Sequence, residues 1–200
     1  MFAVPSVLVR ALAIVCRPRV TWSRIATEST SALELLISYV VPLAAIGAFA
    51  TYIGLRSIGI RIAAGQTFHA SVAVARSESL ASFGFALGGV TLVVFYIAAL
   101  APRFGLERSF GSAARIASYA LTPVWIAGVT LLAPQLALVR VFAALYAVVL
   151  LALGLEIVLG APRRRAALFA AAVIGCAFAS AFVFGAGAAI VRGMAKGAPP

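Results

Sequence analysis

The chain has 200 residues, of which 64% are hydrophobic and only 10% are charged, and its mean hydropathy is +1.13. A soluble domain is roughly half apolar and about a quarter charged, and about a quarter to a third of its chain stays in contact with water, so a soluble protein is excluded. The net charge of +11 does not indicate nucleic-acid binding, because the basic residues lie between apolar runs, where they set membrane orientation.

The N-terminal segment, residues 1–30, contains an apolar stretch over residues 2–16 that is short for a membrane span. As a helix it would reach only ~22 Å and would place Arg10 near the centre of the bilayer, where a charge is costly. Its apolar residues recur at the spacing of one helix face: Val4, Val7, Leu8, Ala11 and Val15. We therefore expect an amphipathic helix that lies in the membrane interface, inside a cytoplasmic or interfacial segment.

Five later runs are long enough to cross the ~30 Å hydrocarbon core, which takes about 20 helical residues. They cover residues 32–54, 81–101, 116–133, 136–160 and 166–191. Helices are expected because lipid cannot satisfy free backbone groups. The sequence thus predicts an all-α membrane protein, a bundle of five transmembrane helices within residues 31–191. Residues 55–80 are expected to form a surface loop, and residues 192–200 a disordered tail.

The basic residues predict the orientation of this bundle. With the N-terminus inside, the cytoplasmic segments carry 4 + 3 + 3 = 10 Lys and Arg residues and the opposite segments 3 + 1 + 2 = 6. The positive-inside rule therefore favours a cytoplasmic N-terminus. Fifteen of the sixteen basic residues are arginine and the chain is rich in alanine, which indicates a GC-rich genome. We interpret the protein as a multi-pass protein of a bacterial inner membrane.

Two predicted spans contain proline. Pro42 removes the hydrogen bond to the carbonyl of Ser38, and Pro123 removes the bond to the carbonyl of Tyr119, so each marks an expected kink. Both prolines follow a Ser-Tyr pair. Under the predicted topology the two helices run in the same direction, so the similarity indicates either a parallel repeat or a chance echo in apolar sequence.

Glu34 and Glu156 are the acidic residues closest to the predicted hydrocarbon region. A carboxylate in a span is by default a functional hypothesis. Both lie near the predicted cytoplasmic face, where Arg24 or Arg163 could pair with them. One interpretation is an interfacial ion pair that fixes helix depth, and the other is a proton or ion site.

Small and basic residues suggest further contacts. Gly84 and Gly88 form a Gly-x-x-x-Gly pair that permits close helix approach, and we expect it to pack helices within the bundle rather than between chains. Arg163, Arg164 and Arg165 form a basic triplet after the fourth span. This triplet is interpreted as a topology anchor, with binding of anionic headgroups at the cytoplasmic face as the alternative.

Residues for catalysis or cofactor binding are missing from the sequence. The chain has no aspartate, one histidine and two separated cysteines, and it contains no Gly-rich phosphate loop and no nucleophile–base motif. We therefore expect no enzyme activity, no cofactor and no metal site.

The order of several features resembles the Yip family of multi-pass membrane proteins, named for interaction with Ypt/Rab GTPases. These features are Pro18-x-x-x-Trp22-x-x-Ile25, Tyr39-x-x-Pro42-Leu43, Ser118-Tyr119 with Pro123, and Gly154 ahead of Pro162. The resemblance covers residues 15–190 and implies a five-helix bundle without catalytic activity. Family members in eukaryotes act in vesicle traffic, partly through a longer N-terminal region, so the fold carries over here and a GTPase partner does not.

Two functions from different classes follow. The leading hypothesis is a non-enzymatic protein that organises the membrane or partner proteins through helix packing, with lipids, other membrane proteins or a second copy as partners. The alternative is a small transporter, channel or lipid-moving protein that uses the two proline-kinked helices and Glu156.

Overall fold

The computed structural model describes residues 4–61, 67–132 and 136–197, and the side chains of residues 7–59, 67–132 and 136–183. The first part of the chain forms α1 (Val4–Cys16), α2 (Pro18–Ala26), α3 (Ala32–Leu35), η1 (Leu36–Val40), α4 (Val41–Ile53), η2 (Gly54–Ile58), β1 (Ile60–Arg61) and β2 (Thr67–Phe68). The remainder forms α5 (Val72–Leu100), η4 (Ala101–Phe104), α6 (Phe110–Ala120), α7 (Thr122–Ala127), η5 (Gly128–Leu132), α8 (Ala137–Val158) and α9 (Arg163–Gly197). η1 and η2 are π-helices, η4 and η5 are 3-10 helices, and β1 pairs with β2 in antiparallel register.

Five helical segments are long and apolar enough to cross a membrane. They are Ala32–Ile58, Val72–Phe104, Phe110–Leu132, Ala137–Val158 and Arg163–Val183. The shortest has 21 residues, which is enough to span the hydrocarbon core at 1.5 Å per residue. The all-α fold with five membrane-spanning helices is therefore confirmed.

Two helices extend beyond the ranges expected from hydropathy. α5 begins at Val72, inside the expected loop, because the Ser71 hydroxyl caps the helix by accepting a hydrogen bond of 3.3 Å from the Val74 N–H. α9 continues through Gly197 into the stretch expected to be disordered, and residues 198–200 lie outside the described residues. Polarity therefore marks the edge of the apolar span but not the end of the helix.

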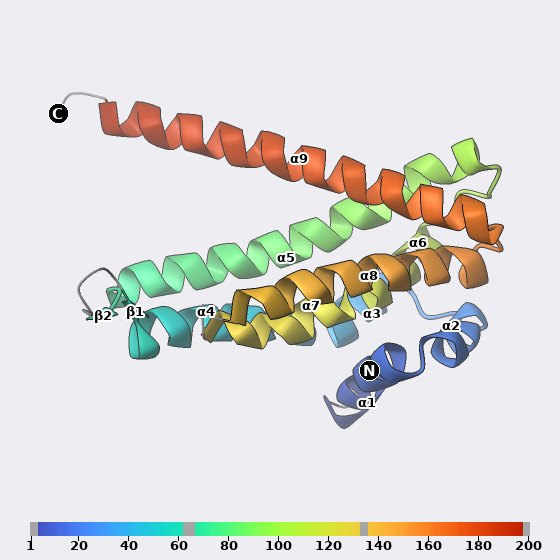
Figure 1. Cartoon of the computed structure of the whole chain (residues 1–200), viewed down its shortest axis with the longest axis horizontal. Helices are drawn as coiled ribbons and strands as arrows, with labels where there is room; N and C mark the ends of the chain where they lie inside the picture. The colour runs from blue at the N-terminus through green and yellow to red at the C-terminus, as the bar shows by residue number, and fades with distance from the viewer. Residues whose placement is uncertain (1–3, 62–66, 133–135, 198–200) are drawn as a thin grey trace.

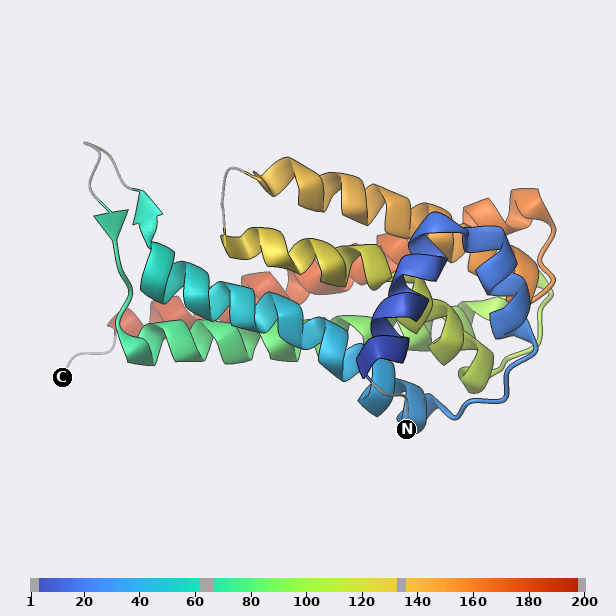
Figure 2. The same cartoon turned by 90° about the horizontal axis from the view of Figure 1, so that it is seen from below.

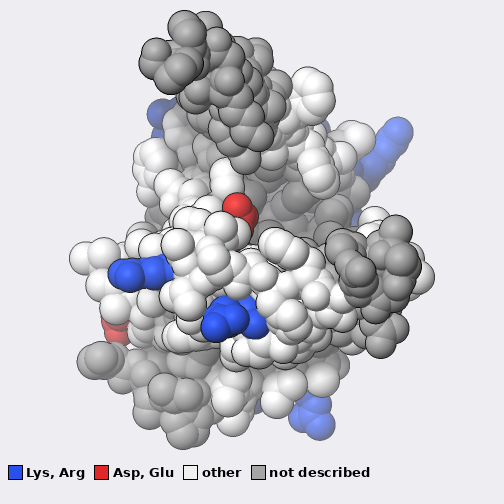
Figure 3. Space-filling view, turned by 90° about the vertical axis from the view of Figure 1, so that its left-hand side faces the viewer, with Lys and Arg blue, Asp and Glu red and all other residues white. Residues whose placement is uncertain are grey.

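The helices form a bundle with one diverging member. Figures 1 and 2 show α4, α5, α7 and α8 running along a common axis. α9 packs against α8 and α5 at one end and diverges from them toward the other (Figure 1). α1 and α2 fold into a helical hairpin, here called the N-terminal hairpin, which lies across the side of the bundle near the end that holds α6 (Figure 2). The opposite end shows separate basic side chains on a largely uncharged surface (Figure 3).

α1 is helical, as its apolar stripe predicts, and has two apolar faces. Val7, Ala11 and Ile14 are buried, whereas Leu8 and Leu12 are exposed. The buried face packs against the bundle. The exposed face leaves apolar surface for lipid, which suits a helix at the membrane interface.

Both prolines lie where the helix geometry changes. The π-helix η1 precedes Pro42, and its wider turn lets the Val41 N–H donate to the Leu36 carbonyl. Pro123 is the second residue of α7, and one residue, Leu121, separates α7 from the end of α6. Each change in helix geometry therefore lies beside a proline, which has no backbone N–H to donate to the preceding turn.

The two proline-containing segments cross closely at glycines. A Cβ atom at Gly128 would lie 3.0 Å from the Cα of Gly47, closer than ordinary van der Waals contact. Because both residues are glycines, with a hydrogen atom in place of a side chain, the backbones of α4 and η5 can come into contact. This crossing holds the two interrupted spans side by side.

Candidate functional site

Four aromatic side chains fill the space between the interrupted spans and the N-terminal hairpin. The centres of the Tyr39 and Tyr119 rings are 4.6 Å apart. The Trp22 ring lies edge-to-face with the Tyr119 ring, with 6.3 Å between their centres. Trp125 contacts Tyr39 at 6.4 Å. Such geometries are favourable beyond the apolar area they bury. The two Ser-Tyr motifs of the sequence thus supply the centre of one aromatic cluster.

The Thr122 hydroxyl, which is itself hydrogen-bonded to the Tyr39 hydroxyl, replaces the backbone hydrogen bond that is lost at Pro123. The Thr122 hydroxyl donates to the Tyr119 carbonyl at 2.8 Å, the same carbonyl that Pro123 leaves without its helical partner. A threonine hydroxyl has one proton, so the Tyr39 hydroxyl is the donor in its 2.9 Å bond to Thr122 Oγ1. This pair links the first span to the third inside the bundle.

The N-terminal hairpin docks on the bundle through Trp22. A Cβ atom at Gly154 would lie 2.9 Å from Cη2 of the fully buried Trp22 and 3.1 Å from Ile116 Cγ2. Because Gly154 has no side chain, the Trp22 indole can pack directly against the backbone of α8. The Tyr146 hydroxyl, also on α8, fixes the other helix of the hairpin by donating to the Val15 carbonyl at 2.7 Å.

Charged residues hold the hairpin to α6. Arg10 on α1 forms an ion pair with Glu28, which follows α2, and its guanidinium lies 5.4 Å from the centre of the Tyr119 ring. Arg115 on α6 donates to the backbone carbonyls of Glu28 and of Ile25. Two arginines from different helices thus converge on the segment where the hairpin ends.

The same contact contains buried polar atoms that are not satisfied. Within the described part of the chain, Trp22 Nε1, Glu28 Oε2, Arg115 Nε and the Tyr119 hydroxyl have no hydrogen-bond partner. Each such atom typically costs about 1–3 kcal/mol. For the hairpin to stay docked, the free energy gained from packing and from the ion pair must exceed the cost of burying these polar atoms without partners.

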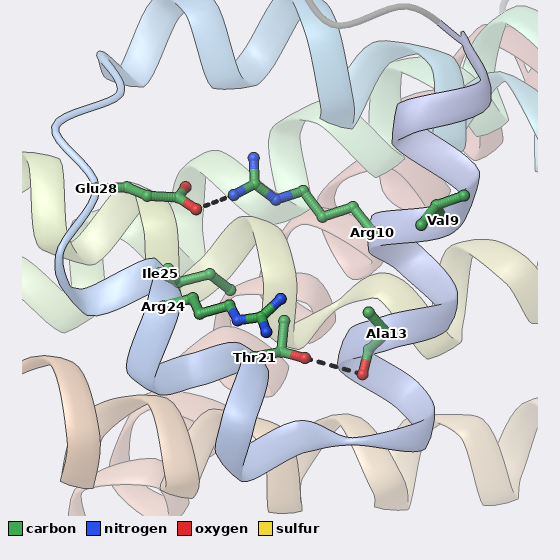
Figure 4. A pocket seen from close by; sticks show the side chains of 7 residues that line it. All are labelled: Val9, Arg10, Ala13, Thr21, Arg24, Ile25 and Glu28. Carbon is green, nitrogen blue, oxygen red and sulfur yellow. Dashed lines mark hydrogen bonds and ion pairs between the residues drawn. The ribbon is translucent and has the colours of Figure 1, made fainter.

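A cavity of about 320 Å³ opens between the two helices of the hairpin (Figure 4). Arg10 reaches into it from α1 and Arg24 from α2, and Glu28 meets the tip of the Arg10 side chain at the open end of the hairpin. The Thr21 hydroxyl on its wall donates to the Ala13 carbonyl at 3.0 Å. The cavity thus has arginine on two sides, and one of these arginines is paired with a carboxylate.

A second hollow, here called the apolar groove, lies between α5, α7, α8 and α9 and measures about 620 Å³. Its walls are apolar and include Phe85 and Gly89 on α5, Trp125 on α7, Ala144 on α8 and Phe178 on α9. Phe85 is 76% exposed and Phe178 is 71% exposed. All of these residues belong to segments long and apolar enough to span a membrane, so the groove lies at membrane depth.

The glycine pair on α5, expected from sequence to pack helices within the bundle, makes no close contact with the described part of the chain. Cβ atoms at Gly84 and Gly88 would meet no described atom within 4 Å, and both residues are exposed. Small residues permit close approach of a helix without specifying which helix approaches. These glycines leave bare helix backbone beside the apolar groove.

The other candidate residues are not brought together. Glu34 lies exposed near the start of α3, where its N–H donates to the Ser31 hydroxyl. Glu156 is half-buried on α8, and no ion pair joins it to Arg163. The basic triplet of residues 163–165 is exposed at the start of α9. Neither glutamate lines either of the two cavities.

Sequence reasoning missed the ion pair between Arg10 and Glu28. A signal was present, because Pro18 starts α2 directly after α1, and a hairpin turn there brings residues 18 positions apart to the same end. An arginine in an apolar helix needs an acidic partner nearby. Arg115 carried no comparable signal, because its contact depends on packing between distant segments.

A family model described as the Yip1 domain matches residues 12–185 of the chain. No curated protein and no solved structure matches it. The matched stretch begins within α1 and ends within α9, so it contains the whole aromatic cluster and the whole apolar groove.

Proposed function

Because the chain belongs to the Yip1-domain family of membrane proteins, we propose that it is a non-enzymatic protein that organises other membrane proteins by lateral helix packing. The apolar groove is the docking site in this proposal, and its occupant is an apolar transmembrane helix of another polypeptide. The exposed glycine pair beside the groove carries the proposal. Glycine inside a helix costs roughly 0.5–1 kcal/mol relative to alanine, and Gly84 and Gly88 recover nothing by packing inside the described chain.

The shape of the groove suits a helix. On α5 the exposed ring of Phe85 and Gly89 line the groove, and the exposed glycines Gly84 and Gly88 precede them by one residue each, so an incoming helix gains aromatic contact in the groove and close backbone approach beside it. In lipid, association depends on such packing and not on a hydrophobic driving force, because the lipid tails are equally apolar.

The transport hypothesis has less support. A route for an ion or polar solute requires polar groups that line a continuous path. The groove has apolar walls, and neither cavity includes Glu156 or Glu34. Lateral packing uses the residues that the structure leaves exposed, whereas transport would require residues that the structure does not bring together.

The proposed orientation places the N-terminus in the cytoplasm of a bacterial cell. The hairpin end of the bundle holds the links from α5 to α6 and from α8 to α9 (Figure 1). By the count from the sequence, that end carries ten Lys and Arg residues and the opposite end six. The positive-inside rule supports this orientation, and a reporter fused to either terminus tests it.

Photocrosslinking tests the docking site. A photoreactive phenylalanine analogue replaces Phe85 in the groove, and Phe49 on α4 is the matched control because it is 67% exposed and does not line the groove. We expect Phe85 to give a polypeptide adduct in native membranes that Phe49 does not give. We also expect Gly88→Leu to abolish the adduct without harming the fold, because nothing lies within 4 Å of its Cβ position.

Each outcome has a clear meaning. An adduct of twice the chain mass identifies a second copy as the donor of the helix, and a different mass identifies a partner protein. Lipid adducts alone, equal adducts from both positions, or an adduct that survives Gly88→Leu would each refute docking at this groove.

A further inference from the structure

The cavity inside the N-terminal hairpin has the features of a phosphate site. It measures about 320 Å³ and lies between α1 and α2, with a guanidinium group reaching it from each helix (Figure 4). A phosphate group between two such helices would be held from opposite sides. Arginine suits this role because its planar fork of donors matches phosphate oxygens.

The charges around the cavity leave a positive excess. The carboxylate of Glu28 is paired with Arg10, and Arg115 reaches the same segment from α6. Arg24 is exposed on α2, and no described carboxylate pairs with it. Near the cavity, the one carboxylate of Glu28 thus lies with three arginines, and Arg24 is the arginine that lines the cavity without a described carboxylate partner.

Apolar residues around the cavity indicate the source of the phosphate. Val9 lines the cavity and is 67% exposed, and Leu8, Leu12 and Val20 lie exposed on the same hairpin. A surface that combines exposed leucine and valine with arginine is typical of helices at the boundary between acyl chains and headgroups. The phosphate available at that depth belongs to a phospholipid, and basic pockets at this level of a membrane protein hold lipid headgroups.

We propose that the hairpin cavity binds the headgroup phosphate of an anionic phospholipid. Arg24 is the principal ligand, and Arg10 and Arg115 add positive potential while Glu28 keeps Arg10 in place. The site is independent of the apolar groove, which lies between other helices. The hairpin would thereby fix one lipid at the basic end of the bundle.

The chain offers a matched pair of variants for the test. Arg24→Gln removes the proposed ligand, and Arg19→Gln removes an equal charge from another exposed position of α2 that does not line the cavity. The purified full chain in neutral detergent is titrated with phosphatidylglycerol, and retained lipid is measured by native mass spectrometry. We expect one retained lipid, about tenfold weaker retention in Arg24→Gln, and little change in Arg19→Gln.

Further arms separate a site from general attraction. Arg24→Lys keeps the charge but loses the fork of donors, so it should retain the lipid at an intermediate level. Phosphatidylcholine, whose headgroup has no net charge, should be retained less than phosphatidylglycerol. Thermal unfolding of each variant is the control, and we expect all of them to unfold at the same temperature as the unsubstituted chain because the arginines replaced are exposed.

Three results would overturn the proposal. Equal loss in Arg24→Gln and Arg19→Gln would show attraction to basic surface without a site. Retention of inorganic phosphate in place of lipid, lost in Arg24→Gln, would show an anion site with the wrong source. No retained phosphatidylglycerol in the unsubstituted chain would exclude the site altogether.

Discussion

Substitution of Gly154 tests how the N-terminal hairpin is held. A methyl group in Gly154→Ala would lie 2.9 Å from Cη2 and 3.0 Å from Cζ2 of Trp22, so the indole must move or leave. Overpacking of this kind typically costs about 1–3 kcal/mol. Alanine is the better helix former by about 1 kcal/mol, but residue 154 stays helical whether or not the hairpin is docked, so this gain cancels in the opening equilibrium.

Trypsin reports that equilibrium directly. Arg19 and Arg24 both lie within α2 of the hairpin, and cleavage there follows the open population when opening is fast. A shift of about 1–3 kcal/mol corresponds to roughly a 5- to 150-fold increase in that population, since about 1.4 kcal/mol is tenfold. We expect Gly154→Ala to speed cleavage at these arginines by about tenfold or more.

A control and a rescue define the contact. Gly88→Ala makes the same change where no described atom lies within 4 Å, so it should leave cleavage unchanged. Trp22→Phe removes the ring atoms that the new methyl group meets, so the double variant with Gly154→Ala should lose less than the sum of the single effects. Equal cleavage in the Gly154 and Gly88 variants, or additive effects with Trp22→Phe, would refute this docking.

Three further predictions concern single side chains. Thr122→Val leaves the tyrosine donor and the freed carbonyl without partners, so the free energy of unfolding in detergent should fall by about 1–3 kcal/mol, whereas Thr91→Val on the exposed face of α5 should change it little. Glu28→Gln breaks the ion pair with α1 and should speed tryptic cleavage of the hairpin several-fold, but the exposed Glu107→Gln should not; equal rates would contradict the pairing. Proteoliposomes should show no ion or solute flux that Glu156→Gln abolishes, and such a flux would favour the transport hypothesis.

The membrane fold follows from the sequence because hydropathy is a local property. Each span contains its own apolar run, so counting runs of about 20 residues finds all five helices. The break at Pro123 is equally local, since the missing N–H and the Thr122 hydroxyl that replaces it lie one residue apart. Helix ends were less predictable because capping by a residue such as Ser71 extends a helix beyond its apolar part.

The contacts of the candidate site were not predictable in the same way. Trp22 and Gly154 both appear in the motifs that indicate the family, yet their contact joins α2 to α8 and requires the whole bundle to form. The partner of Gly84 could not be read for a related reason, because the sequence shows a surface that permits packing but not the helix that occupies it. Local chemistry is readable from sequence, whereas the choice among distant partners is decided by the global fold.

The yield of polypeptide adducts from a photoreactive group at Phe85 tests the central claim most directly. Lateral docking predicts a defined adduct in native membranes, absent when the photoreactive group is at the similarly exposed Phe49 and lost in Gly88→Leu. If the correctly folded variant with the photoreactive group at Phe85 gave only lipid adducts, the claim would be contradicted.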